Sequence, residues 1–160
     1  MHLMKPTRRR AATTTGPDNM IAGYDRFQGY QKALKPRKLP LLSGLLAEGE
    51  FTETGGYAGM KKLLPAKPDA VFAASDMMAF GAMRAVREAG LSVPEDIAIV
   101  GYDDLPAASQ VTPALTSIRQ PTERMGSLAV DTLIDMIEKP QTQTRHLLLA
   151  TELIVRSSCC

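Results

Sequence analysis

The sequence predicts an α/β fold built on a mostly parallel, doubly wound sheet. Two short, wholly apolar runs, 70–74 and 97–100, have the composition of strands that helices cover on both faces. Amphipathic helical segments alternate with strand-like runs along the chain, as in α/β proteins. The chain between the two apolar runs is long enough for one helical crossover, so the two strands should be parallel neighbours. A length of 160 residues is sufficient for a substantial core.

The first elements are a strand and a helix. Three β-branched residues at 13–15 lead into a Gly-Pro-Asp turn, which predicts a strand that ends there. Apolar residues then recur at helical spacing over 21–34, and a proline ends the pattern. Asp18 or Asn19 is the expected cap of this helix.

The next segment is less regular. Residues 37–50 are predicted to form a loop, in which the apolar stretch 39–46 could hide a weak strand. A second helix is predicted to begin at Thr54 and to end at Pro65. The glycine-rich stretch 55–59 lacks the strand and turn that precede a phosphate-binding loop, so we interpret it as a loosely packed helix start.

The pattern becomes regular from residue 70 onward. The strand at 70–74 is followed by a predicted helix at 77–89, which Gly90 closes. The later elements are predicted as a strand at 97–100, a short helix at 106–110, a strand at 116–119, a long amphipathic helix from Pro121 to Pro140, and two strands at 147–149 and 153–155.

The charge of the chain is small and unevenly placed. The formal net charge is +2, but Lys5, Arg8, Arg9 and Arg10 fall in the first ten residues without an acidic neighbour. The rest of the chain is therefore mildly acidic, which argues against a nucleic-acid surface over its body. We interpret the basic run as a solvated lead-in to the first strand rather than as a DNA-binding arm.

Composition also excludes several classes of protein. No apolar run approaches the roughly 20 residues of a membrane span, and the first residues lack the apolar core of a signal peptide. Cys159 and Cys160 are adjacent and His2 and His146 are isolated, so we expect no metal site, no cofactor and a reducing compartment. No nucleophile elbow, phosphate loop or zinc-protease motif is present, so an enzyme is not expected.

Four residues are candidates for a ligand site. Asp76 and Asp103 follow neighbouring strands, and ligands of such sheets bind at the carboxyl ends of strands. Asp76 could instead cap the helix it precedes, while Ser75 could be that cap or could offer its hydroxyl to a ligand. Asp103 could be a turn device or could accept hydrogen bonds from two vicinal hydroxyls, and Asp104 is expected to be a turn device. Arg26 could be a solvated helical arginine or a fork of donors for a polyol or carboxylate.

Several stretches together resemble the LacI/GalR family (lac-repressor-like) of bacterial transcriptional regulators, in the C-terminal part of the effector-binding core. The resemblance covers most of the chain, from about residue 8 to residue 159, and the order and spacing of its pieces are specific. The stretches are VFAASDMMAFGA at 71–82, GLSVPEDIAIVGYDD at 90–104, TPALTSIRQP at 112–121, TGP at 15–17, RFQGY at 26–30 and TELIVR at 151–156.

The resemblance implies a sensor with a type I periplasmic-binding-protein-like core, here one lobe plus part of the other. In the family a small sugar-like or nucleoside-like effector binds between two lobes and changes the affinity for operator DNA. Arg26 and Asp103 match the family's effector-contacting arginine and aspartate. Ser75 falls where many members have an asparagine, so a shorter hydroxyl replaces an amide there. Asp76 is a helix cap or a secondary contact.

The resemblance also implies a division of the chain. Residues 1–7 are an unmatched leader, 8–116 form the rear lobe, 117–140 cross to the front lobe, and 141–160 return as terminal strands. The helix-turn-helix DNA-binding domain is absent from the 160 residues, so operator DNA would be bound only through a missing domain. We therefore predict an exposed apolar stripe on the crossing helix, formed by Met125, Leu128, Leu133 and Met136.

Two functions fit these observations. The first is the effector-binding portion of a cytoplasmic, dimeric LacI-type regulator, and the second is a sugar-binding protein of an uptake system, which shares the lobe architecture. The stretch 101–104, with the Thr-Pro and Arg-Gln-Pro runs that follow it, favours the regulator.

Overall fold

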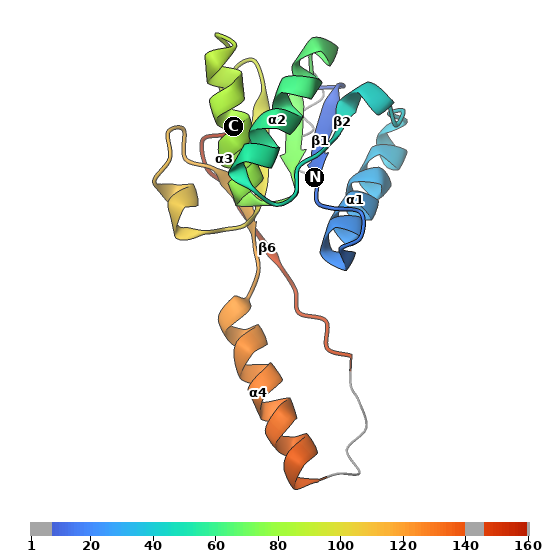
Figure 1. Cartoon of the computed structure of the whole chain (residues 1–160), viewed down its shortest axis with the longest axis vertical. Coiled ribbons are helices and arrows are strands. Elements are labelled where there is room, and N and C mark those ends of the chain that lie inside the picture. Colours follow the sequence, from blue (N-terminus) through green and yellow to red (C-terminus); the bar gives the residue numbers. More distant parts are fainter. Residues whose placement is uncertain (1–7, 140–145, 160) are drawn as a thin grey trace.

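The computed structural model describes residues 8–139 and 146–159 and is built around one six-stranded sheet. The strand order is β2-β1-β3-β4-β5-β6; the first five run parallel, and β6 pairs antiparallel with β5 (Figure 1). This confirms the predicted α/β class and the parallel pairing of the two apolar runs. The strands are β1 (Ala11–Thr15), β2 (Leu46–Glu48), β3 (Ala70–Ala73), β4 (Ala98–Asp103), β5 (Thr116–Arg119) and β6 (Glu152–Ile154).

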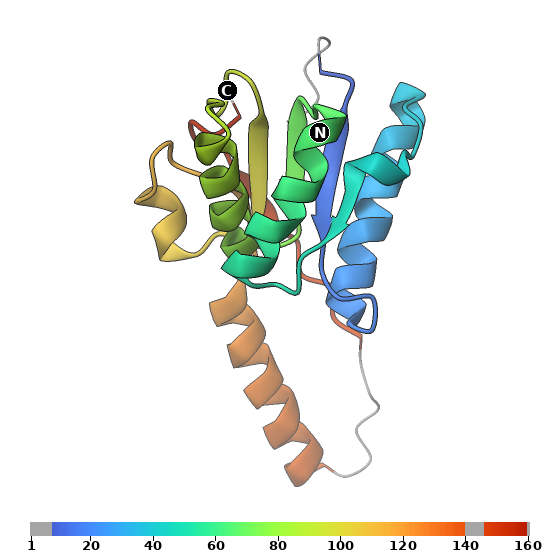
Figure 2. The ribbon, with the colours of Figure 1, turned by 45° about the horizontal axis from the view of Figure 1, so that its top comes forward.

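Helices flank the sheet on both faces. α2 and α3 lie side by side over one face, and α1 lies on the other (Figure 2). The 3₁₀ turns between the elements described are η1 (Lys35–Arg37), η2 (Ser43–Leu45), η3 (Leu64–Ala66) and η4 (Pro106–Ser109). The α-helices are α1 (Ile21–Leu34), α2 (Glu53–Leu63), α3 (Asp76–Glu88) and α4 (Thr122–Glu138).

Two apolar clusters follow from the alternation of strand side chains. On one face Val71 and Ile99 pack with buried residues of α2 and α3, such as Met60. On the other face Val100 packs in the cluster that contains Tyr30 of α1. The sheet is therefore covered from both sides, as the wholly apolar strands require.

The contact between α2 and α3 is closer than the glycine-rich sequence of α2 suggested. A Cβ at Gly56 would lie 2.2 Å from the carbonyl oxygen of Met78, and a Cβ at Gly81 would lie 2.0 Å from that of Glu53. The prediction of a loosely packed helix start was wrong, because these glycines let two helix backbones meet.

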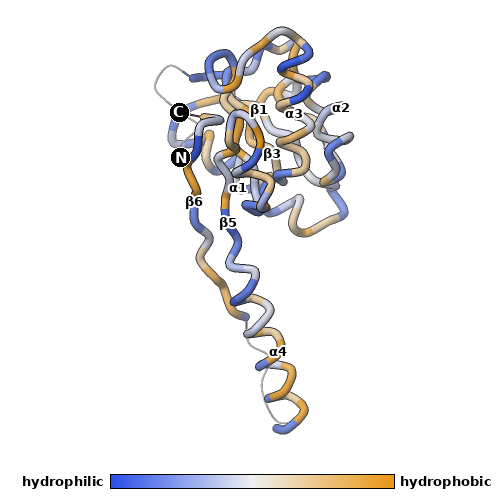
Figure 3. Tube along the Cα trace, turned by 90° about the vertical axis from the view of Figure 1, so that its left-hand side faces the viewer, coloured by the Kyte–Doolittle hydropathy of each residue, from blue (hydrophilic) through white to orange (hydrophobic). Residues whose placement is uncertain are grey.

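α4 projects away from the sheet (Figures 1 and 3). None of its residues is buried. The exposed fractions of Met125, Leu133 and Met136 are 46%, 57% and 46%, and Leu128 is half-buried. The predicted exposed apolar stripe is therefore present, and Figure 3 shows apolar residues along this helix.

Three local predictions were wrong. The residue before α1 is Met20 and no side chain caps the helix, so neither Asp18 nor Asn19 does. Residues 147–149 form no strand, because they find no partner strand in the described sheet. The second helix begins at Glu53 and is capped by the Thr52 hydroxyl, which accepts from Gly55 N–H at 3.0 Å.

The described part of the basic run before β1 is solvated at Arg9 and Arg10, as predicted, whereas Arg8 is half-buried. The Arg8 guanidinium donates to the carbonyl oxygens of Pro94 at 3.1 Å and Cys159 at 3.2 Å. The Arg10 guanidinium donates to the carbonyl oxygen of Lys67 at 3.1 Å. These bonds tie the start of β1 to neighbouring segments.

Some predictions fall outside the described residues. These are the leader 1–7 with His2 and Lys5, Pro140 and the rest of 140–145, and Cys160. Among the helices described, none is long and apolar enough to cross a membrane.

Candidate functional site

The carboxyl edge of the sheet brings two of the predicted site residues together. Asp103 is the last residue of β4 and Arg26 lies on α1. The Arg26 Nη2 atom is 3.3 Å from Asp103 Oδ1, and the same oxygen accepts from the Gln120 side-chain amide at 2.8 Å. A cation, a carboxylate and an amide therefore meet at one point.

Aromatic rings surround the Arg26 guanidinium. Its central carbon lies 4.0 Å from the centroid of the Tyr102 ring and 5.3 Å from that of the Phe51 ring. Arg26 Nη1 also donates to the carbonyl oxygen of Ala74 at 2.5 Å, and only 14% of the Arg26 side chain is exposed. Cation–π contacts and hydrogen bonds thus fix the side chain, which overturns the alternative of a solvated arginine.

Phe51 reaches this site from an unusual loop. Its φ is 57°, in the left-handed region that residues with a Cβ rarely adopt. The Phe51 ring lies against Gly16, where an added Cβ would be 2.1 Å from the ring. Gly16 therefore leaves room for the ring beside the end of β1.

Ser75 caps the helix that follows β3. Its hydroxyl accepts from Met78 N–H at 3.2 Å, and the residue is only 4% exposed. Of the two predicted roles the structure shows the cap; a contact between Ser75 and an effector stays a prediction.

Asp76 is not a helix cap. It is the first residue of α3, fully buried, and its carboxylate accepts from the Ser117 hydroxyl at 2.5 Å and from Leu105 N–H at 2.7 Å. Burial raises the pKa of Asp76, although these two hydrogen bonds oppose the rise. Gly101 makes this packing possible, because a Cβ there would lie 2.2 Å from Asp76 Oδ1. Asp76 therefore joins α3 to β5 and to the loop after β4.

Burial and neighbouring side chains have opposite effects on the pKa of Asp103. Burial raises its pKa above the ordinary value for aspartate, while Arg26 and Gln120 partly offset the rise. The pair of Arg26 and Asp103 presents hydrogen-bond donors and acceptors side by side, which is what vicinal hydroxyls require. In the described part of the chain, no cluster of three or more His, Cys, Asp or Glu could hold a metal ion.

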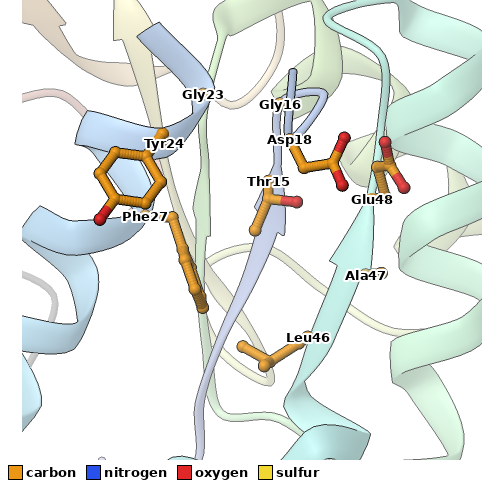
Figure 4. Close-up of a pocket in the computed structure, with 9 residues that line it drawn as sticks. All are labelled: Thr15, Gly16, Asp18, Gly23, Tyr24, Phe27, Leu46, Ala47 and Glu48. Atoms are coloured by element: carbon orange, nitrogen blue, oxygen red, sulfur yellow. The ribbon is translucent and has the colours of Figure 1, made fainter. Parts of the chain in front are cut away.

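Two hollows lie on the flanks of α1. One, of about 540 Å³, opens between α1 and strands β3 to β6, with Arg26, Tyr102 and Leu153 in its walls. The other, of about 250 Å³, lies between α1 and β2, where Tyr24 and Phe27 form one wall and Asp18 and Glu48 lie opposite (Figure 4). The first hollow shares Arg26 and Tyr102 with the site, and the second lies on the other flank of α1.

Sequence reasoning missed three residues of this site: Phe51, Tyr102 and Gln120. Tyr102 and Gln120 occur in the motif stretches but were given no role, although each lies at the carboxyl end of its strand, or just after it. Phe51 lies in a loop whose path depends on left-handed residues, and no periodic signal pointed to it.

The chain is similar to known regulators over nearly its whole length. Residues 2–159 match the family described as periplasmic binding protein-like domain. The HTH-type transcriptional regulator CelR of Thermobifida fusca is 44% identical over 158 residues, which are 98% of this chain and 46% of that protein. The chain thus spans about half the length of the curated relatives it matches.

Solved structures give the same result. A complex of the transcriptional regulator CelR with cellobiose superposes with a TM-score of 0.92 at 44% identity, covering 96% of this chain and 47% of that one. The lac repressor dimer bound to operator and the anti-inducer ONPF superposes with a TM-score of 0.90 at 31% identity, covering 98% of this chain and 55% of that one. The overall fold is therefore shared with regulators of known structure.

Proposed function

The chain belongs to the periplasmic binding protein-like domain family and, within it, to the LacI/GalR-type regulators, and we propose that it is the effector-sensing portion of such a regulator. The observation that carries the proposal is the Arg26–Asp103 pair between aromatic rings at the carboxyl edge of the sheet. The family relationship supports a sensing role, and this site supports the choice of residues.

The chemistry of the site suits a sugar. Asp103 can accept hydrogen bonds from adjacent hydroxyls, and the Arg26 guanidinium retains donors beyond those that Ala74 and Asp103 use. Phe51 offers an apolar ring beside them, against which the C–H face of a sugar could pack. A small site of this kind combines apolar contact with a few oriented polar groups.

The charges near the site favour a neutral effector. Arg26 is already paired with Asp103, so its charge is compensated. The ends of β1 and β2 add the acidic side chains of Asp18, Glu48 and Glu50 to the same edge. A phosphate or carboxylate would meet net negative charge, whereas a neutral polyol would not. We therefore expect a neutral sugar, and a complex with cellobiose is known for the similar regulator CelR.

The site is half of a cleft in this proposal. Residues 8–116 form the rear lobe, and 117–140 cross to a front lobe to which the apolar stripe of α4 would pack. The segment 141–160 returns, with β6 completing the sheet. An effector that binds the closed arrangement of lobes better than the open one shifts the population toward closure.

The remaining features of the proposed role concern the whole protein. We expect a homodimer that binds operator DNA through a domain outside this chain and acts in the cytoplasm, where bacterial operators lie. A lac repressor dimer bound to operator is among the similar structures. Catalysis forms no part of the role, since binding alone shifts the population of lobe arrangements.

The proposal is tested with a complete regulator that contains this sequence. Operator affinity is measured with and without cellobiose, glucose and ribose, with glucose 6-phosphate as the charged control. At least one neutral sugar should change operator affinity about tenfold or more, and the phosphate ester should have less effect. A complete protein that binds sugar but no operator DNA would support the uptake-protein alternative instead.

A further inference from the structure

The corner at the end of β4 contains two consecutive residues with φ in the left-handed region. Asp103 has a φ of 117° and Asp104 a φ of 56°. Residues with a Cβ adopt such conformations at a cost, and these persist only where the surroundings fix them. The contacts of the corner must therefore account for its shape.

Backbone hydrogen bonds fix one side of the corner. Asp104 N–H donates to the Ser117 hydroxyl at 3.0 Å, and Leu105 N–H donates to the Asp76 carboxylate at 2.7 Å. The Ser117 hydroxyl in turn donates to Asp76. Both acceptors lie in buried residues of the neighbouring elements β5 and α3.

The Asp104 carboxylate fixes the other side of this corner. It is only 4% exposed and lies between two arginines. Its Oδ2 atom is 2.7 Å from Nε of Arg119, the last residue of β5. Its Oδ1 atom is 2.7 Å from Nη1 of Arg156, which follows β6. Burial acts to raise the pKa of Asp104, but the two arginines outweigh it and hold that pKa below the ordinary value. Asp104 thus lies in the turn that the sequence predicted, but two arginine side chains hold its carboxylate.

Two consecutive residues of one segment, at the end of β5, bind the two aspartates. Arg119 binds Asp104, and the next residue, Gln120, binds Asp103. The carboxylate of Asp103 then faces Arg26. The direction of Asp103 thus depends on the corner that Asp104 anchors.

We propose that Asp104 is a positioning residue of the site: its ion pairs with Arg119 and Arg156 fix the corner after β4 and so direct the Asp103 carboxylate toward Arg26 and the effector. The last step rests on the proposed function, whereas the direction toward Arg26 is a property of the chain without effector. The chain passes from β5 to α4 and returns to the sheet at β6. The Asp104 carboxylate, bound to Arg119 of β5 and to Arg156 after β6, therefore links the corner at Asp103 to both of these strands.

The test needs no effector. The pH titration of the Asp103 carboxyl carbon is followed by NMR in the parent chain, in Arg26→Gln, in Asp104→Asn and in the double variant. In the parent, Arg26→Gln should raise the Asp103 midpoint, because it removes a neighbouring positive charge. In the Asp104→Asn background, the same change at Arg26 should move the midpoint by less than half as much. Equal displacement in both backgrounds would overturn the proposal.

Two further variants serve as a substitute for Asp104→Asn and as a control. If Asp104→Asn does not fold, Arg119→Gln removes one of the two anchors at a half-exposed position and should reduce the displacement in part. Asp135→Asn removes an exposed ion pair with Lys139 and should leave the displacement unchanged. A reduction by Asp135→Asn equal to that by Asp104→Asn would count against the proposal. If no sugar binds the complete regulator, the proposed function fails while this titration still decides the role of Asp104.

Discussion

Arg26 and Asp103 are 77 residues apart in the sequence, yet their side chains meet 3.3 Å apart at the edge of the sheet. The fold brings them together, because β4 ends at the carboxyl edge of the sheet and α1, which follows β1, begins at the same edge (Figure 2). The contact is partly buried, with side-chain exposures of 14% and 26%. It couples the stability of the fold to the geometry of the proposed site.

The pair should therefore be measurable without an effector. Arg26→Gln alone should lower the free energy of unfolding by about 1 to 2 kcal/mol, because it leaves a partly buried carboxylate without its cation. Combining it with Asp103→Asn should cost less than the sum of the two single changes. Urea denaturation of the four proteins measures the coupling, and strict additivity would show that the contact contributes nothing.

The packing of α2 on α3 gives a second prediction. Gly56→Ala should destabilise the chain by about 3 kcal/mol, because its Cβ would meet the backbone of Met78. Gly126→Ala, on the exposed α4, meets nothing within 4 Å and should be neutral or stabilising by up to about 1 kcal/mol. Thermal unfolding checks both. Similar melting temperatures for the two variants would contradict the close contact of the helices.

The apolar stripe of α4 should contribute nothing to the stability of this chain. Leu133 is 57% exposed, so Leu133→Lys should change the free energy of unfolding by no more than about 0.5 kcal/mol. Leu63→Ala at a fully buried position is the comparison, with an expected cost of about 3 kcal/mol. In the complete regulator Leu133→Lys should become costly, because the front lobe would bury that residue. An equal cost in both proteins would argue against the crossing segment.

Asp104 predicts a pH dependence with a definite sign. Burial opposes ionisation, but Arg156 and Arg119 outweigh it and lower the pKa of the folded state. The stabilisation by Asp104 is therefore fully present above the unfolded pKa of about 3.9 and is lost as the pH falls below it, toward the folded pKa. The difference in unfolding free energy between the parent and Asp104→Asn should stay constant from about pH 7 to 5 and shrink below about pH 4. A difference that grows in acid would contradict this account.

Much of the fold could be predicted from local signals. The runs at 70–74 and 97–100 are apolar because both faces of their strands are covered, and periodicity alone placed the helix at 21–34 correctly. The predictions failed where contact with a distant segment of the chain determines the local structure. Residues 147–149 have strand composition but no partner strand among the described residues, and the glycines of α2 needed the position of α3 to be understood.

The site was predictable only in part. Asp103 follows an apolar strand and so could be placed at the carboxyl edge, and the family resemblance added Arg26. Phe51 and the ion pairs of Asp104 depend on left-handed backbone and on contacts between distant segments, neither of which has a periodic signature. The sequence left Asp76 as a helix cap or a secondary contact, whereas in the structure its buried carboxylate binds Ser117 of β5.

The affinity of the complete regulator for its sugar tests the central claim most directly. Isothermal titration with the neutral sugar that most affects operator binding is carried out on the parent, on Asp103→Ala and on the control Asp135→Ala. Losing two charge-assisted hydrogen bonds, about 3 kcal/mol in all, should weaken binding about 100-fold in Asp103→Ala. The control should bind as the parent does. Unchanged affinity in Asp103→Ala would show that this edge of the sheet is not the effector site.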